Sequence, residues 1–238
     1  MNLMIIENVS KKFGGIAALK NLDLAVEKGK ILGVIGPNGA GKTTLINVIT
    51  GYEKVDAGKI NYDGKDISKL PPHVRARHGI VRTFQIPRCF AGLTVLENIM
   101  IPVLLRHSRG EAERRARSIA ERMLLGDDLH KQAETLPVGG LKLLELARAY
   151  AASPRILLLD EPMGGLSQDR MEPIIRLIRE MREDGLTIIL VEHVMKAVVA
   201  LADILAVLNF GERLAHGRPC DVMKLKAVRD AYLGEGHA

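Results

Sequence analysis

The sequence predicts an α/β fold in which helices cover a parallel β-sheet. Strand-like apolar runs alternate with helical stretches along the second half of the chain, as they do in parallel sheets. Near the start, one apolar run ends in a glycine-rich turn that leads directly into a helix. Of the 238 residues, 47% are hydrophobic, which is enough for a large core, so disorder is not expected.

The N-terminal part of the chain is expected to be mostly β-structure. Short runs of apolar residues alternate or cluster there as in strands, and one continuous run is typical of a buried strand. Strands are expected at 3–9, 22–26, 30–35, 58–62 and 80–83. A helix is expected at 42–50, directly after the glycine-rich turn.

The middle of the chain is expected to be a helical insertion. Helices are predicted at 95–105, 111–125 and 140–152. The second is amphipathic, because apolar residues recur at helical spacing opposite Glu and Arg side chains. Its apolar face is expected to consist of Ala112, Ala116, Ile119, Ala120, Met123 and Leu124.

The last third of the chain returns to alternating strands and helices. Strands are expected at 156–159, 187–191 and 204–208, with one helix ending near Arg182 and another beginning near Val194. Residues 221–238 are expected to form a short helical tail. No internal repeat or low-complexity segment is present.

Composition argues against several classes of protein. The formal net charge is +6, but Lys and Arg are interleaved with Glu and Asp along the chain. This pattern favours an ordinary solvated surface, which could face anionic lipid, over a nucleic-acid-binding surface. Cys89 and Cys220 lie too far apart, with no further ligands at suitable spacing, to indicate a disulfide framework or a zinc site. Residues 1–9 are too short for a secretion signal. The longest apolar stretch, 197–210, falls short of the roughly 20 residues that span a bilayer, so no transmembrane segment is expected.

The glycine-rich turn matches the phosphate-binding motif G-x-x-x-x-G-K-[ST] without a mismatch. Its backbone N–H groups and the following helix N-terminus favour phosphate oxygens, Lys42 supplies a positive charge, and Thr43 is expected to bind Mg²⁺. The alternative is a structural turn that carries Lys and Thr by chance. The expected ATP-binding residues here are Gly36, Pro37, Asn38, Gly39, Ala40, Gly41, Lys42, Thr43 and Thr44.

Two carboxylates follow the apolar strand at 156–159. Asp160 stands where a protein with this phosphate loop needs an acid for its metal ion, and Glu161 is expected to polarise the attacking water as a general base. Without the phosphate loop, such a pair would more often be ordinary loop carboxylates. The two motifs together predict a site that binds ATP and Mg²⁺.

Beyond these two motifs, the chain from Phe13 to about residue 217 resembles the ABC ATPase family. The resemblance implies that Phe13 stacks on adenine, although an ordinary core Phe is the alternative. It also implies that Gln85 contacts Mg²⁺ or the lytic water, and that His193 contacts the γ-phosphate. The implied fold is a P-loop NTPase core with an antiparallel β subdomain and an inserted helical subdomain. Residues 1–84 and 154–238 would form the core, and 85–153 the inserted part.

A narrower resemblance concerns the cargo. Phe13-Gly14-Gly15, the run from Val81 to Gln85 and the tail 231–235 are similar to ATP-binding subunits of bacterial branched-chain amino acid importers. This implies membrane permease subunits as partners, a periplasmic solute-binding protein as an indirect one, and a place on the cytoplasmic face of the inner membrane. Related subunits carry other small solutes, and an exporter of lipid or lipopolysaccharide remains an alternative. A soluble ABC ATPase acting on DNA or ribosomes and a module that binds ATP without hydrolysing it are further alternatives.

The sequence departs from the family at the signature L-S-G-G-Q. Here it is Leu136-Pro137-Val138-Gly139-Gly140, and Pro137 offers neither the hydroxyl nor the N–H of the serine it replaces. A neighbouring loop carries Ser167 in place of the family's usual Asp or Asn. In this family each ATP lies between one subunit's phosphate loop and its partner's signature. We therefore expect a heterodimer with a second ATPase whose signature is intact, in preference to a homodimer.

Overall fold

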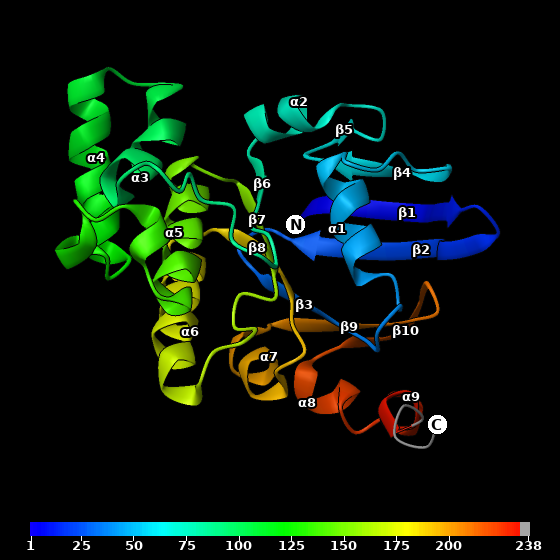
Figure 1. Ribbon diagram of the computed structural model, residues 1–238. Helices are drawn as coiled ribbons and strands as arrows, with labels where there is room; N and C mark the ends of the chain where they lie inside the picture. The colour runs from blue at the N-terminus through cyan, green and yellow to red at the C-terminus, as the bar shows by residue number, and fades with distance from the viewer. Residues whose placement is uncertain (234–238) are drawn as a thin grey trace.

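A six-stranded, mostly parallel sheet forms the centre of the molecule (Figure 1), as the computed structural model shows for residues 1–233. Its order is β10-β9-β3-β8-β7-β6, and only β10 runs antiparallel to its neighbour. The strands are β3 (Ile31–Ile35), β6 (Ile80–Arg82), β7 (Ile156–Asp160), β8 (Thr187–Val191), β9 (Ile204–Asn209) and β10 (Glu212–Gly217). Every residue of β3, β7 and β8 is buried, as expected for parallel strands covered on both faces.

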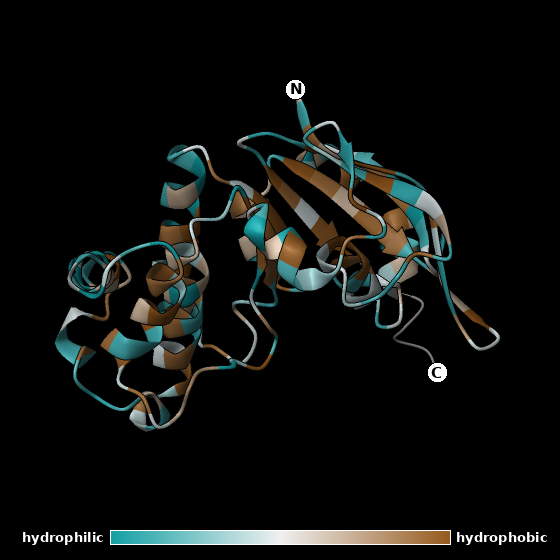
Figure 2. Ribbon diagram, turned by 90° about the horizontal axis from the view of Figure 1, so that it is seen from above, coloured by the Kyte–Doolittle hydropathy of each residue, from teal (hydrophilic) through white to brown (hydrophobic). Residues whose placement is uncertain are grey.

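A second, antiparallel sheet lies beside it, in the order β2-β1-β4-β5. Its strands are β1 (Asn2–Phe13), β2 (Ile16–Glu27), β4 (Ala57–Tyr62) and β5 (Lys65–Asp66). Its apolar residues share one buried cluster with the parallel sheet and with helix α1 (Lys42–Thr50). Helix α1 thus connects the glycine-rich turn to the core between the two sheets, and Figure 2 shows the hydrophobic strands gathered in this part of the molecule.

A group of helices lies to one side of the sheets (Figure 1). They are α3 (Val95–Leu104), α4 (Arg109–Arg122) and α5 (Val138–Ala151), with short 3-10 turns η1 (Gly126–Asp128) and η2 (Ala133–Thr135) between the last two. Their apolar residues join α6 (Gln168–Glu183) and the other face of the parallel strands in a second core. The antiparallel and helical subdomains expected from the family resemblance are therefore both present. The exact division at 85 and 153 stays a prediction.

Several elements differ from the sequence expectation. Strands β1 and β2 are longer than expected, because their exposed ends pair with each other without an apolar pattern. Helix α4 ends at Arg122, and Leu124 is half exposed with a φ of 59°, so its predicted place on the apolar face was wrong. The sequence did not predict β5, β10 or the short helix α2 (Pro72–Arg77), which lack a continuous apolar run.

The C-terminal part contains α7 (Met195–Leu201), α8 (Pro219–Val222) and α9 (Lys226–Leu233). The expected helical tail is thus present as far as residue 233, and its last five residues lie outside the described part of the chain. Cys89 and Cys220 are free thiols. Within residues 1–233, no helix is both long enough and apolar enough to cross a membrane.

Candidate functional site

The glycine-rich turn connects β3 to α1 and requires glycine at two places. A Cβ on Gly36 would lie 2.2 Å from the carbonyl oxygen of Leu208, and one on Gly41, whose φ is 103°, would lie 2.5 Å from that of Ala18. Both contacts are with backbone, which cannot move aside easily. The loop is therefore packed tightly against β9 and β2 and is held in one shape.

Lys42 is the first residue of α1. Its ammonium donates hydrogen bonds to the carbonyl oxygens of Gly36, at 2.6 Å, and Pro37, at 2.9 Å. No acidic side chain occupies the first turn of α1 and no side chain caps it, so the positive end of the helix dipole is available to an anion. Thr43 in the same turn is exposed. This end of the helix provides the donors that a phosphate group needs.

Three expected catalytic side chains meet where the parallel strands end. Gln85 follows β6, Glu161 follows β7 and His193 follows β8, and these strands are neighbours in the sheet. The Gln85 side-chain amide donates to the Glu161 carboxylate at 2.7 Å, and His193 Nδ1 lies 3.6 Å from the same oxygen. Their convergence follows from topology, since the carboxyl ends of parallel strands share one edge of a sheet.

Asp160, the last residue of β7, is buried and paired with Arg82. The guanidinium lies 3.2 Å from the Asp160 carboxylate and donates to the Asn47 amide oxygen on α1 at 2.7 Å. Burial raises the pKa of Asp160, and the Arg82 charge opposes this shift. The guanidinium also lies 4.5 Å from the centre of the Phe84 ring. Arg82 was not identified from the sequence, where it is simply one residue of the run that leads to Gln85.

Two further residues support Glu161 and His193. Glu192 is buried and accepts hydrogen bonds from the backbone N–H groups of Met163, His193 and Val194, at 2.8, 2.9 and 3.1 Å. Lys142 on α5 is buried and donates to the Glu161 carbonyl oxygen at 2.9 Å. Burial lowers the pKa of Lys142. Neither residue was identified as part of the site from the sequence, because their roles depend on contacts with the backbone of distant segments.

Phe13 stands at the end of β1, near the turn to β2. It is 45% exposed, so the alternative of an ordinary core Phe is wrong. The Lys11 ammonium lies 5.1 Å from the ring centre. An exposed ring is available for stacking, and adenine stacking by Phe13 stays a prediction.

The degenerate signature lies at the start of α5. Pro137 precedes the first helical residue, Val138, and provides no side-chain hydrogen bond to the helix. A Cβ on Gly140 would lie 3.3 Å from the Leu136 Cβ, so a glutamine there would require a small shift of its neighbour. Ser167 stands before α6 in the same way, also without a capping hydrogen bond. The phosphate loop and the carboxylates keep the residues expected from the resemblance, whereas Pro137, Gly140 and Ser167 depart from them.

The expected Mg²⁺ ligands fit the ion chemically. Thr43, Gln85 and Asp160 all supply oxygen, which Mg²⁺ prefers. Among the described residues no three His, Cys, Asp or Glu side chains form a metal-binding group. Mg²⁺ is usually bound by one or two protein groups together with phosphates and water, and binding of the ion by these three residues stays a prediction.

Comparison with known proteins gives a consistent result. A family model described as ABC transporter matches residues 19–164. A probable branched-chain amino acid transport ATP-binding protein, LivG of Archaeoglobus fulgidus, is 37% identical over 98% of this chain and 96% of its own. The lipopolysaccharide export system ATP-binding protein LptB of Escherichia coli is 34% identical over 99% of this chain and 98% of its own. The solved ADP conformation of the cassette MJ1267 superposes with a TM-score of 0.89 at 33% identity, over 98% and 99% of the two chains.

Proposed function

Because the chain belongs to the ABC transporter family, we propose that it is the ATP-hydrolysing subunit of an importer for branched-chain amino acids or related small solutes. It would drive transport through separate membrane permeases, on the cytoplasmic face of the inner membrane. The observation that carries the proposal is the meeting of Gln85, Glu161 and His193 at the sheet edge where β3 leads into the phosphate loop. The relative with the transport name supports the cargo class.

The reaction is in-line attack of water on the γ-phosphate of ATP. Glu161 accepts the proton of the attacking water. The Gln85 side-chain amide donates to the Glu161 carboxylate at 2.7 Å and orients this carboxylate. Lys42 and the backbone N–H groups of the phosphate loop stabilise the charge on the transferred group, and His193 contacts the γ-phosphate. Thr43, Asp160 and Gln85 would hold Mg²⁺, which would add to the neutralisation of the phosphate charge.

The permease is expected to contact the surface around the segment after Gln85. Ile86 and Leu105 are 78% and 83% exposed, and Tyr52 and Phe90 are also exposed. Tyr52 and Leu105 line one hollow together with Phe84, which precedes Gln85 in the chain. Exposed apolar side chains that gather in this way favour a protein partner. Movement of this segment would transmit ATP binding to the membrane subunit, with the periplasmic solute-binding protein acting further upstream.

The degenerate signature supports a heterodimer. Pro137 lacks the donors that a γ-phosphate in the partner's site needs, so two copies of this chain would form two weak sites. A second ATPase with an intact signature would complete the site that contains Lys42. The expectation would be contradicted if the purified chain alone hydrolysed ATP cooperatively and at the same rate as its mixture with the second ATPase.

Two substitutions test the hydrolytic role. Lys42→Ala should abolish Mg-ATP binding in titration calorimetry, whereas Glu161→Gln should keep binding and lose phosphate release by the mixed complex. Lys196→Ala, which changes an exposed surface lysine paired with Glu172, is the matched control. Normal phosphate release by Glu161→Gln would favour a module that binds ATP without hydrolysing it.

Lipopolysaccharide export is the second candidate function, because LptB is nearly as similar as LivG. The permease that co-purifies with the chain, followed by uptake of radiolabelled branched-chain amino acid into vesicles, separates the two. Uptake that depends on Glu161 supports the importer. A co-purified exporter permease without uptake would overturn the importer.

A further inference from the structure

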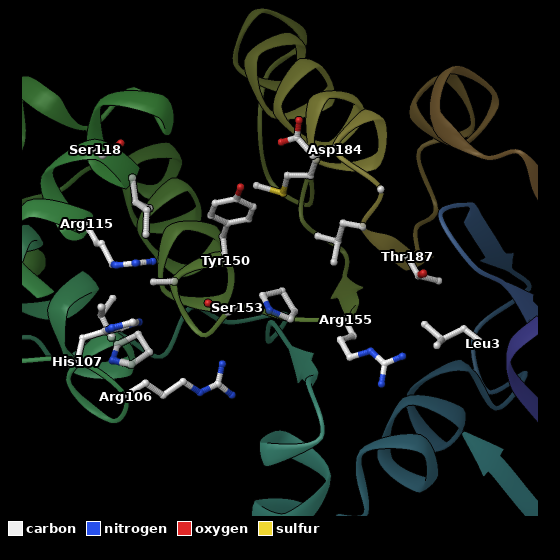
Figure 3. A pocket seen from close by; sticks show the side chains of 18 of the residues that line it. Leu3, Arg106, His107, Arg115, Ser118, Tyr150, Ser153, Arg155, Asp184 and Thr187 are labelled. Atoms are coloured by element: carbon white, nitrogen blue, oxygen red, sulfur yellow. The ribbon is translucent and has the colours of Figure 1, made fainter. Parts of the chain in front are cut away.

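A cavity of about 560 Å³ lies between the helical subdomain and the two sheets, and we call it the interlobe cavity. Arg106, just after α3, and Arg115, on α4, line it from the helices, while Lys28 and Arg155 line it from the strands. Figure 3 shows Arg106 and Arg115 extending from the helical side toward the side that carries Arg155. Its volume is within the range of cavities that hold small ligands.

The interlobe cavity is separate from the ATP site. Arg155 directly precedes β7 and Thr187 begins β8, so the cavity lies at the amino ends of these strands. Asp160 ends β7 at the other edge, and four residue steps of about 3.3 Å place the two regions roughly 13 Å apart along the strand. A ligand in the cavity would not occupy the phosphate loop.

The charges around the interlobe cavity do not balance. Asp184, the one acidic residue that lines it in the described part of the chain, is paired with Arg122 at 2.6 Å. Arg115 is paired with Glu111 at 2.6 Å, and Arg155 with Asp63 at 2.7 Å. Each of these two guanidinium groups forms one such bond, although it carries five N–H donors.

Two cations of the cavity wall form no ion pair with a carboxylate of the described residues. The Arg106 guanidinium donates to the carbonyl oxygen of Ala152, at 3.2 Å, and Lys28 acts on Asp63 only from beyond ion-pair distance. Among residues 1–233, neither Arg106 nor Lys28 has a carboxylate oxygen within 4.0 Å of its charged nitrogens. If the three ion pairs above are each counted as neutral, Arg106 and Lys28 leave two positive charges unbalanced, and donors from different elements remain available to an anion.

The floor of the interlobe cavity is apolar. Val103, Met181 and Leu186 are buried residues that line it. Tyr150, labelled in Figure 3, also lines it. A bare inorganic ion would leave this surface without a partner. A ligand with a charged head and an apolar body would satisfy both parts of the cavity.

From this combination, we infer that the interlobe cavity binds a small organic phosphate. A phosphate monoester carries a charge of about −1.5 to −2 at neutral pH, which matches the excess of two cations better than a single carboxylate does. Guanidinium groups bind phosphate oxygens in a bidentate manner. Arg106 and Arg155 would hold the phosphate, and the organic body would pack on the apolar floor.

Such a ligand would connect the helical subdomain to the strands. It would favour the arrangement seen here, in which Lys42 donates to the Gly36 carbonyl oxygen and Gln85 to the Glu161 carboxylate. Resting on the proposed function, this predicts slower ATP hydrolysis when the cavity is filled. The binding itself does not depend on hydrolysis and is tested without ATP.

Phenyl phosphate is a suitable probe, because its ring protons report binding by saturation-transfer NMR. We expect wild-type protein to bind it at millimolar concentrations, and the variant Arg106→Gln/Arg155→Gln to bind about tenfold more weakly or worse. Both side chains are exposed, so the fold should tolerate the change. The matched control is Arg114→Gln, which removes an exposed arginine of α4 that does not line the cavity.

A further variant and a further probe locate the binding. Binding that persists in Lys42→Ala supports the interlobe cavity, whereas its loss there would place the probe in the phosphate loop and overturn the inference. Equal binding by wild type and the double variant would also overturn it, as would no signal with wild type. Flotation with phosphatidylglycerol vesicles tests a lipid source. Vesicle binding that needs Arg106 and Arg155, without binding of phenyl phosphate, would reject the small ligand.

Discussion

Arg82→Met isolates the pairing between Arg82 and the buried carboxylate of Asp160. The two charged groups lie 3.2 Å apart, and both side chains are less than 10% exposed. With an effective dielectric constant of about 20, two unit charges at this distance attract each other by about 5 kcal/mol. Methionine keeps much of the apolar bulk beside Phe84 but leaves the carboxylate unpaired. We expect the free energy of unfolding to fall by about 3–5 kcal/mol.

Urea denaturation followed by circular dichroism measures this loss, since the chain has no Trp to report by fluorescence. Adding Asp160→Asn to Arg82→Met should restore much of the stability, because the unpaired charge is then removed. Burial already raises the pKa of Asp160 in the wild type, and removing Arg82 raises it further. A carboxyl group whose pKa is raised in the folded protein makes the folded state less stable as the pH increases above the ordinary pKa of 3.8. The difference in unfolding free energy between wild type and Arg82→Met should therefore become smaller as the pH falls toward 3.8.

The outcome that refutes this reasoning is a double variant no more stable than Arg82→Met alone. The pairing would then contribute nothing, and the loss would come from the bond to Asn47 or the contact with Phe84. A deficit that is constant from pH 7 to pH 4 would equally show that the Asp160 charge is not involved. Asp160→Asn in the wild-type background completes the cycle and gives the coupling energy directly.

Three further substitutions test other contacts. Asn98→Ala removes a fully buried amide that forms hydrogen bonds with backbone groups of the loop before α3. The free energy of unfolding in urea should fall by about 2–4 kcal/mol, and a fall below about 0.5 kcal/mol would contradict the role of these bonds. Burial raises the pKa of Glu145, so ionisation of this carboxyl group destabilises the folded protein as the pH rises above 4.5. Glu145→Gln should therefore become more stable relative to wild type as the pH rises above 4.5, and a stability difference that does not depend on pH would refute this. Glu192→Gln places an amide donor against backbone donors, and should lower stability by about 2–4 kcal/mol and slow hydrolysis through His193, whereas the surface control Glu183→Gln should change neither.

The sequence predicted the parallel strands well because their residues are continuously apolar. The runs at 30–35, 187–191 and 204–208 match β3, β8 and β9 to within one residue. The short β5 and the exposed β10 carry no such pattern, and their pairing depends on neighbours already in place. Burial patterns alone could not reveal them.

The site was predicted where residues belong to a local motif, and missed where distant segments meet. The phosphate loop is contiguous, so its position and shape follow from sequence. Arg82 and Asp160 are 78 positions apart, and nothing in the local sequence of either indicates the other. Lys142 appears in sequence as one charge on a helix, yet its contact with the Glu161 carbonyl oxygen arises only when α5 packs beside β7.

The ammonium group of Lys42 would exchange one set of oxygen partners for another if a nucleotide binds as proposed. In this structure it donates hydrogen bonds to two carbonyl oxygens of its own turn. Its contribution to affinity is therefore the difference between phosphate and carbonyl contacts, which is smaller than the whole strength of a lysine–phosphate pair. In return, these two hydrogen bonds join the lysine side chain to the start of its own turn, so the phosphate loop holds its shape through contacts within the protein.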